Sequence, residues 1–208
     1  MQKIMFSDEF QLTKAVLEGR KTMTRRIAYI GDFQKPIAGF LTEGSVAGTL
    51  VLTDNWKAVA KSRYKVGEVV AVAQNYGAIL DELEDPRNFS CMEHWESKSS
   101  DRGKYAELAM YSPGGENKMF VCADEMPHQI RITNVRVERL QDISDEDCMR
   151  EGLIGDKQAC LYGYRNRKHY ETFFNPRDAF AALIDKISGK GTWNRNPWVF
   201  VYEFELIK

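Results

Sequence analysis

The chain has 208 residues and a mass of 23.9 kDa, which suits one large domain or a modest domain with insertions and is too short for two full-sized enzyme domains. Hydrophobic residues make up 43% of the chain and aromatic residues 12%, enough to build a sizeable core, so disorder of the whole chain is excluded. The 29 basic and 30 acidic side chains nearly cancel to a net charge of −1, so an anionic partner has to be held by a local basic patch.

The first predicted elements are a short strand over residues 4–6 and a helix with apolar residues at helical spacing between 12 and 16. Gly19 suits the position that ends a helix. Strand composition follows at 46–52 and again at 69–73, where β-branched residues indicate a buried strand.

The composition changes between residues 78 and 118, which are rich in charged residues, Ser, Gly and Pro and show little sustained periodicity. We interpret this segment as an insertion. Segments of this length are usually functional lids or disordered, and the sequence does not separate the two alternatives.

The second half of the chain resumes strand composition at 119–123 and at 129–140, where apolar and basic residues alternate. A capped short helix is predicted at 144–151, a longer one at 175–187, and a final strand with period-two alternation at 198–206. Many strands, few helices and no regular strand–helix repeat predict an α+β fold with a small, mostly antiparallel sheet or barrel decorated by helices.

A basic cluster directly follows the first predicted helix. Guanidinium and ammonium groups beside hydroxyls supply donors to a phosphate or a polarised carbonyl, and a helix exit supplies a turn that can make them converge. Charge density alone leaves a solvated basic loop open as the alternative. The cluster consists of Arg20, Lys21, Thr22, Thr24, Arg25 and Arg26.

Four sequence blocks resemble those of an ASCH-domain protein. They are Ile-Met-Phe-Ser at 4–7 followed by Leu-Glu-Gly-Arg-Lys-Thr-Met-Thr-Arg-Arg at 17–26, Tyr-Lys-Val-Gly-Glu at 64–68, residues 132–152, and the Asn-Pro-Trp-Val block at 196–204. The likeness runs from one terminus to the other, with the 78–118 insertion outside it. The resemblance implies a single domain with a PUA-like β-barrel, a fold associated with RNA binding, of a long type often carried by phages and prophages.

Some small members of this superfamily remove the acetyl group from N4-acetylcytidine with a Lys, a Thr and a Glu, and these match Lys21, Thr24 and Glu151. The resemblance implies that the Thr24 hydroxyl attacks the acetyl carbonyl, that Lys21 takes its proton, and that Glu151 orients the lysine or shuttles protons to the leaving amine. Lys21 is either a base or an anion holder. Like charges at Arg20, Arg25 and Arg26 lower its pKa and Glu151 raises it, and the sequence leaves this balance open.

The chain departs from the family pattern at Gln74 and Asn75, where longer members carry an Arg-Glu pair. The departure favours contacts with a neutral polar ligand over a second phosphate clamp. The alternative is a strand end whose side chains satisfy their own turn.

A second basic stretch at 162–170 interleaves tyrosines with cations that include Arg165 and Arg167. This composition suits single-stranded nucleic acid, because bases stack on the rings while cations follow the phosphates. The alternative is a loop whose tyrosines fold back on the core.

These features predict an RNA- or nucleotide-binding ASCH module that holds its ligand in a basic cleft. The alternative is an amidohydrolase that deacylates N4-acetylcytidine or a related modified nucleoside, and a cleft for a protein partner is not excluded. Each function at this cleft requires the 20–26 turn and Glu151 to line a common, solvent-open hollow.

The sequence also predicts a cytoplasmic protein without a membrane partner. Apolar stretches are only a few residues long, and the first residues lack the apolar region of a signal peptide. The scattered cysteines are expected to be reduced thiols, and no cofactor or metal site is predicted. They are Cys91, Cys122, Cys148 and Cys160.

Overall fold

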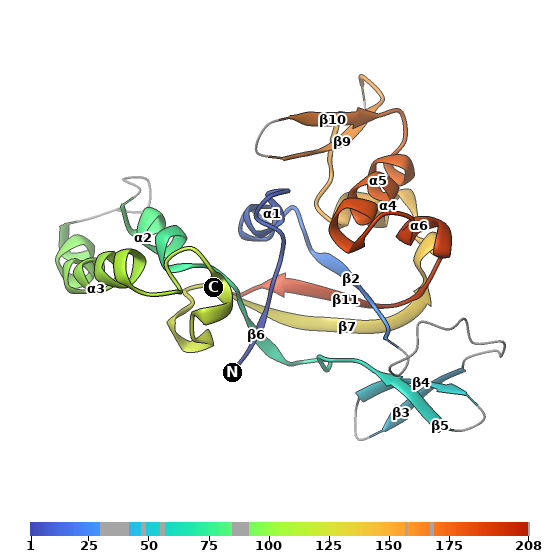
Figure 1. The fold of residues 1–208 in the computed structure, drawn as a ribbon, viewed down its shortest axis with the longest axis horizontal. Coiled ribbons are helices and arrows are strands. Elements are labelled where there is room, and N and C mark those ends of the chain that lie inside the picture. Colours follow the sequence, from blue (N-terminus) through green and yellow to red (C-terminus); the bar gives the residue numbers. More distant parts are fainter. Residues whose placement is uncertain are drawn as a thin grey trace. The chain divides into compact units, whose positions relative to one another are not determined.

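The structure is a computed structural model, and it describes residues 1–29, 42–46, 49–54, 57–84, 92–156, 158–166 and 169–207. The chain divides into two compact units, of which the first consists of residues 1–6 and 70–129 and the second of residues 7–69 and 130–207. Both units mix helices with strands (Figure 1). The predicted α+β class is therefore confirmed.

The second unit is built on three antiparallel strands. They are β2 (Met23–Ile27), β7 (Gln129–Arg139) and β11 (Trp198–Leu206). The last strand lies in the middle, so that Val201 pairs with Arg25 on one side and with Arg136 on the other. Residues 199–202 are all buried, because both faces of this strand are covered, and the predicted alternation of exposed and buried positions is lost there.

Two smaller antiparallel sheets complete the strands of the second unit. One consists of β3 (Thr42–Val46), β4 (Thr49–Asp54) and β5 (Lys57–Lys61), and the other of β8 (Ile154–Asp156), β9 (Leu161–Arg165) and β10 (Tyr170–Phe173).

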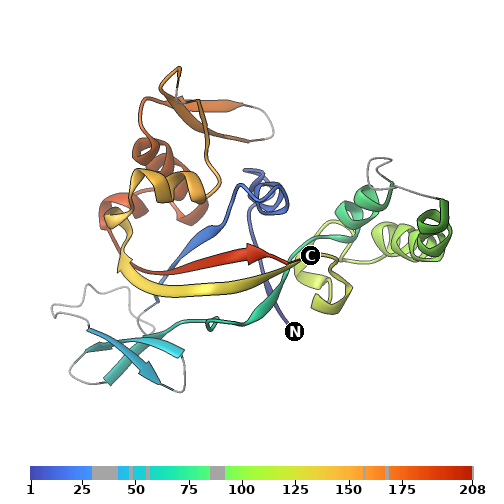
Figure 2. The ribbon, with the colours of Figure 1, turned by 180° about the vertical axis from the view of Figure 1, so that it is seen from behind.

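The helices of this unit are α1 (Leu12–Leu17), η4 (Leu140–Asp142), α4 (Asp145–Arg150), α5 (Pro176–Ser188) and α6 (Thr192–Arg195). The caps predicted for the 144–151 and 175–187 helices are confirmed, because the side chain of Ser144 accepts a hydrogen bond from the Asp147 N–H and that of Asn175 accepts one from the Asp178 N–H. Helix α5 packs against α4, α6 and the sheet of β9 and β10 (Figure 2).

The first unit contains two short parallel strands and a set of helices. Its elements are β1 (Gln2–Ile4), β6 (Val69–Val72), α2 (Tyr76–Glu84), α3 (Met92–Tyr111), η2 (Lys118–Phe120) and η3 (Ala123–Glu125). Helices α2 and α3 pack together in both views (Figure 1 and Figure 2). The core beneath them contains Ala71, Tyr76, Ile79, Val121 and Met126.

Two expectations about this unit are corrected. Most of the described part of the expected 78–118 insertion is helical, although its composition resembles that of a loop. Residues 119–123 form no strand but the end of one 3₁₀ turn and the start of the next, with Val121 buried between them.

Within the first unit β1 and β6 are parallel, and within the second unit β11 is antiparallel to both β7 and β2. The prediction of a mixed, mostly antiparallel sheet is confirmed. Among the described residues, no helix combines the length and the apolar character that crossing a membrane requires.

Candidate functional site

The turn between α1 and β2 is fixed by backbone hydrogen bonds within the second unit. The Lys21 N–H donates to the Ala15 carbonyl at 2.9 Å, and the Thr22 N–H donates to the Arg150 carbonyl at 3.0 Å. Gly152 makes this approach possible. Its φ is +100°, and a Cβ there would lie 3.3 Å from the Cβ atoms of Lys21 and Ala15. The turn is therefore held against the end of α4, where Glu151 lies.

The side chains of Lys21 and Glu151 meet although 130 positions separate them. The ammonium Nζ donates to the carboxylate Oε2 at 2.6 Å and to the backbone carbonyl of Glu151 at 2.7 Å. The predicted proximity is therefore confirmed. The two side chains are only 2% and 5% exposed, so the expectation that both line a solvent-open hollow is wrong.

Burial decides the protonation balance of Lys21. Desolvation lowers its pKa most strongly, the charge and hydrogen bond of Glu151 raise it, and the charges of Arg26 and Arg25 lower it further. The net result is a pKa below the usual 10.5. The balance therefore shifts towards the neutral amine that a general base requires.

Arg25 binds the other oxygen of the same carboxylate. Its Nη1 donates to Glu151 Oε1 at 3.1 Å, its Nε to Glu138 Oε1 at 2.8 Å and its Nη2 to Asp147 Oδ2 at 3.1 Å. Although burial alone would lower the pKa of Arg25, the charges of Glu151 and Glu138 outweigh it and raise the pKa. Arg25 therefore positions Glu151, and its donors are occupied by carboxylates.

Two further arginines extend these contacts into an ion-pair network. Arg136 Nη2 donates to Asp147 at 2.6 Å, and Arg150 Nη2 donates to Glu203 at 2.8 Å. The network joins four cations to four carboxylates, so its formal charge is zero and it offers little attraction to an anion. Its members are Lys21, Arg25, Arg136, Arg150, Glu138, Asp147, Glu151 and Glu203.

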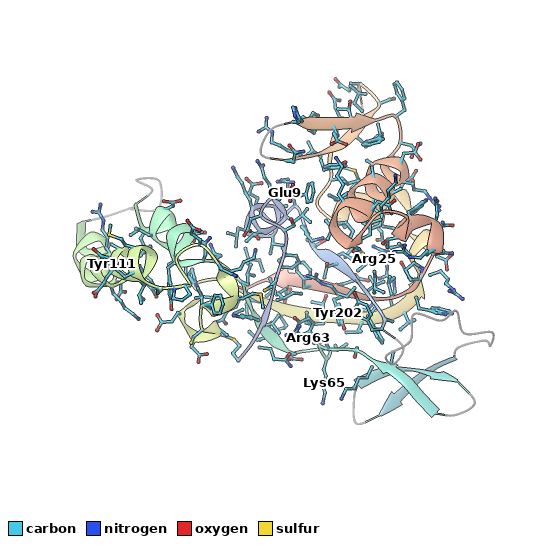
Figure 3. The ribbon with its side chains drawn as sticks, in the orientation of Figure 1. Glu9, Arg25, Arg63, Lys65, Tyr111 and Tyr202 are labelled. Atoms are coloured by element: carbon cyan, nitrogen blue, oxygen red, sulfur yellow. The ribbon has the colours of Figure 1, made fainter. Side chains whose placement is uncertain are left out.

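Thr24 and Arg26 lie on the opposite face of β2 from Arg25, because successive side chains of a strand alternate. Thr24 pairs with Tyr202 across the ladder and is 5% exposed. Burial lowers the pKa of Arg26 most strongly, although Tyr64 and Glu151 oppose this effect. Figure 3 shows the positions of Arg25 and Tyr202 on the two paired strands.

The remaining cluster residues are already engaged near the turn. Arg20 forms a 2.7 Å ion pair with Glu18 at the surface and donates to the Gly152 carbonyl at 3.4 Å. The Thr22 hydroxyl accepts from Arg150 Nε at 3.2 Å. The structure thus gathers the cluster, but most of its cations face protein oxygens.

Gln74 and Asn75 belong to the first unit, whereas the basic cluster belongs to the second. The Asn75 carboxamide oxygen accepts from the Ala78 N–H at 2.7 Å, and its nitrogen donates to the Glu116 carbonyl at 2.9 Å. Asn75 therefore caps the start of α2, which is the turn-satisfying alternative. Gln74 is buried and donates to the Glu82 carboxylate.

Within the 162–170 stretch, residues 162–165 belong to β9 and Tyr170 begins β10. Tyr164 is 1% exposed, packs edge-on against Phe10 and donates its hydroxyl to Glu171 at 2.6 Å. This tyrosine folds back on the core and presents no stacking surface. Arg165 is exposed at the end of β9, and Arg167 lies outside the described residues.

Several network members were not singled out as functional from the sequence. Arg136 alternates with valines in β7, and that alternation only indicated a solvent-facing or ligand-facing position. Asp147 was interpreted as part of a helix cap. Glu138 lies in β7 and Glu203 in β11, and no local signal marks them as partners of Arg25 and Arg150.

Comparisons with protein-family models, with curated proteins and with solved structures gave no match. The likeness to ASCH proteins therefore remains a prediction from the sequence motifs. The function of the chain has to be argued from its own residues.

Proposed function

We propose that the second unit binds a nucleoside of the kind found in RNA beside Lys21 and Thr24 and hydrolyses an amide bond of its acyl group. The observation that carries this proposal is the buried lysine of lowered pKa, hydrogen-bonded to Glu151 at 2.6 Å and placed three residues before a threonine. The base and its orienter are in contact, and the proposed reaction additionally requires the Thr24 hydroxyl to come within hydrogen-bonding reach of Lys21.

In the proposed reaction the Thr24 oxygen forms a bond to the acyl carbonyl carbon while Lys21 takes the hydroxyl proton. The carbon–nitrogen bond then breaks, and the leaving amine takes that proton from Lys21. Water next attacks the threonine ester, which releases the carboxylic acid and restores the hydroxyl. Glu151 orients Lys21 throughout, and Arg25 fixes the second oxygen of Glu151.

Access is the main demand of this proposal. The three residues are each 5% exposed or less, so a substrate has to displace the atoms that cover Thr24 and Lys21. The solvent-open hollow that the sequence predicts is absent from the described part of this structure, so hydrolysis requires a rearrangement that uncovers Thr24 and Lys21.

The test is incubation of the protein with N4-acetylcytidine and chromatographic detection of cytidine. Thr24→Ala should lower the rate by at least about 100-fold, because it removes the nucleophile. Thr172→Ala, at an exposed position of β10, is the matched control and should leave the rate unchanged. Absence of turnover by the folded wild-type protein contradicts the proposal for this substrate.

Binding without chemistry is the second candidate. It is favoured by the two hydrogen bonds that Lys21 Nζ donates to Glu151, since an ammonium held in this way is suited to donate to a ligand oxygen. Thr24→Ala would then leave binding of a nucleotide or RNA intact, and neither the wild-type protein nor the variant would release cytidine. If the wild-type protein has no affinity for RNA, or an affinity that does not change with salt concentration, this candidate is contradicted.

We also infer that the chain is a long ASCH member of the phage or prophage type, with a PUA-like barrel and a cytoplasmic location. The order of the sequence blocks and the antiparallel β7-β11-β2 arrangement support this inference. An experimental structure in which these strands remain an open sheet would contradict the barrel.

A further inference from the structure

Exposed cations alternate with buried side chains at residues 61–65. Lys61, Arg63 and Lys65 are exposed, whereas Ser62 and Tyr64 are only 4% and 3% exposed. The alternation brings three positive charges to the solvent side of one short segment of the second unit.

Arg63 is held in place beside the strand that faces Thr24. Its backbone N–H donates to the Tyr202 hydroxyl at 2.8 Å, and its guanidinium carbon lies 5.5 Å from the centre of the Tyr64 ring. Arg63, Lys65 and Tyr202 are labelled in Figure 3. The Tyr64 and Tyr202 rings pack edge to face at 5.2 Å. Since Tyr202 pairs with Thr24 across the ladder, this segment is anchored next to the proposed nucleophile.

The cations of this segment differ from those of the ion-pair network. Lys61 and Arg63 form no ion pair with a carboxylate in the described part of the chain, and Glu68 contacts the segment through the Lys65 backbone N–H at 2.9 Å. The Arg63 guanidinium also lies close enough to Arg26 for its charge to lower the pKa of Arg26. An external anion would relieve this repulsion.

A buried polar atom on the same segment also lacks a protein partner. The Ser62 Oγ is buried and makes no hydrogen bond within the described residues. Because Ser62 is buried whereas Lys61 and Arg63 are exposed, its hydroxyl does not belong to the cationic surface, and the inference rests on the exposed cations alone.

We propose that Arg63, flanked by Lys61 and Lys65, binds a phosphate of the ligand, so that the substrate is a nucleotide within a single-stranded RNA and not a free nucleoside. This inference rests on the proposed placement of a nucleoside beside Thr24. Arginine supplies paired donors that match phosphate oxygens, and flanking lysines add attraction to neighbouring phosphates.

The experiment compares three probes with the full chain: N4-acetylcytidine, its 5′-monophosphate and a short single-stranded RNA that contains the modified base. Affinity should rise in that order. Arg63→Gln should weaken RNA binding by about tenfold or more and affect the nucleoside less, as expected for loss of a hydrogen bond to a charged group. It should also reduce the salt slope of RNA binding by about 0.7 for each phosphate that the variant no longer neutralises.

Arg131→Gln is the control, because Arg131 is an exposed arginine of the second unit that pairs with Glu205 at 3.2 Å. It should leave all three affinities unchanged. If the monophosphate binds tightly and the RNA binds no more tightly than the monophosphate, the proposal that the substrate lies within an RNA strand is overturned. If Arg63→Gln weakens the binding of all three probes by the same factor, the phosphate subsite is overturned. It is also overturned if the variant loses as much affinity for heparin, an unrelated polyanion, as for the RNA.

The outcomes separate this inference from the proposed hydrolysis. RNA binding that depends on Arg63 without cytidine release supports the phosphate subsite and contradicts the amidohydrolase. If the wild type and Arg63→Gln release cytidine from every probe at the same rate, the amidohydrolase is supported and the phosphate subsite is contradicted.

Discussion

Glu151 divides its carboxylate between two cations, with Oε2 on Lys21 and Oε1 on Arg25. All three side chains are at most 5% exposed, so water does not screen the contacts. Removing one partner of a buried pair leaves the other charge without compensation, which costs more than the pair itself contributes.

Glu151→Gln should therefore destabilise the protein by about 3 kcal/mol, the lower end for broken buried ion pairs. The measurement is the free energy of unfolding from urea denaturation. Glu18→Gln is the control, since Glu18 pairs with Arg20 at the surface and should change stability by no more than about 0.5 kcal/mol. Equal effects of the two substitutions would show that the buried pair has no special energetic role.

The cysteines provide a second test at single positions. Burial raises the pKa of the Cys148 thiol to about 12, whereas Cys122 and Cys160 are exposed. At mildly alkaline pH iodoacetamide should alkylate Cys122 and Cys160 and leave Cys148 unmodified, because the thiolate is the reactive form.

Peptide mass spectrometry assigns each modification to its cysteine. In urea, where the protein is unfolded, Cys148 should react as readily as Cys122 and Cys160. This control shows that burial, and not the local sequence around Cys148, protects the thiol in the native protein. Rapid alkylation of Cys148 in the native protein would contradict its burial.

The pairing of Lys21 with Glu151 could not be predicted from residue spacing. The 20–26 cluster is visible as a group of cations, but charge density does not say which carboxylate each cation faces. Only the resemblance to ASCH proteins connected the cluster with Glu151. The partners Glu138 and Glu203 come from separate strands, and their proximity arises when β7 and β11 pair.

At the scale of elements, the junction after α4 depends on Gly152. Its φ of +100° disfavours side chains, and an added Cβ would press on Lys21 and Ala15 at 3.3 Å. Gly152→Ala should therefore lower the free energy of unfolding by about 1–3 kcal/mol. Urea denaturation measures the change.

Gly103→Ala is the matched control for Gly152→Ala. A Cβ at Gly103 would meet nothing within 4 Å, and the residue lies inside helix α3. This substitution should be neutral or stabilise the protein by up to about 1 kcal/mol. A Gly152→Ala variant as stable as the wild type would contradict the close approach of the turn to α4.

Elements with strong local signals were predicted well. The Asn175 cap and Pro176 define the start of α5, and the β-branched run defines β6. Helices α2 and α3 were missed because their charged composition resembles that of a loop, and their amphipathic packing against Val121 and Met126 depends on residues distant in sequence. Local propensity is a weak guide where tertiary contacts decide.

At the scale of the whole molecule, a net charge of −1 conceals a local separation of charge within the second unit. The ion-pair network is neutral, and the 61–65 segment carries exposed cations. One carboxylate of the network, Glu203, should make stability depend on pH, because its pKa in the native state is lowered.

Opposing effects act on the pKa of Glu203. Burial alone would raise its pKa, but hydrogen bonds from Arg150 and Asn134 and the charges of Arg150 and Arg136 outweigh burial and hold the pKa below the usual 4.5. Between the native pKa and 4.5 the unfolded chain binds more protons than the native one. The stability that this carboxylate contributes is thus fully present above 4.5 and is lost as pH falls through the native pKa.

Glu203→Gln should accordingly be less stable than the wild type at neutral pH, and the difference should shrink progressively below pH 4.5. Urea midpoints measured over this range test the prediction. Glu205→Gln is the control, because Glu205 is 54% exposed beside Arg131 and its replacement should change stability by no more than about 0.5 kcal/mol. A Glu203→Gln difference that stays constant as pH falls would mean that the carboxylate contributes through packing and not through its charge.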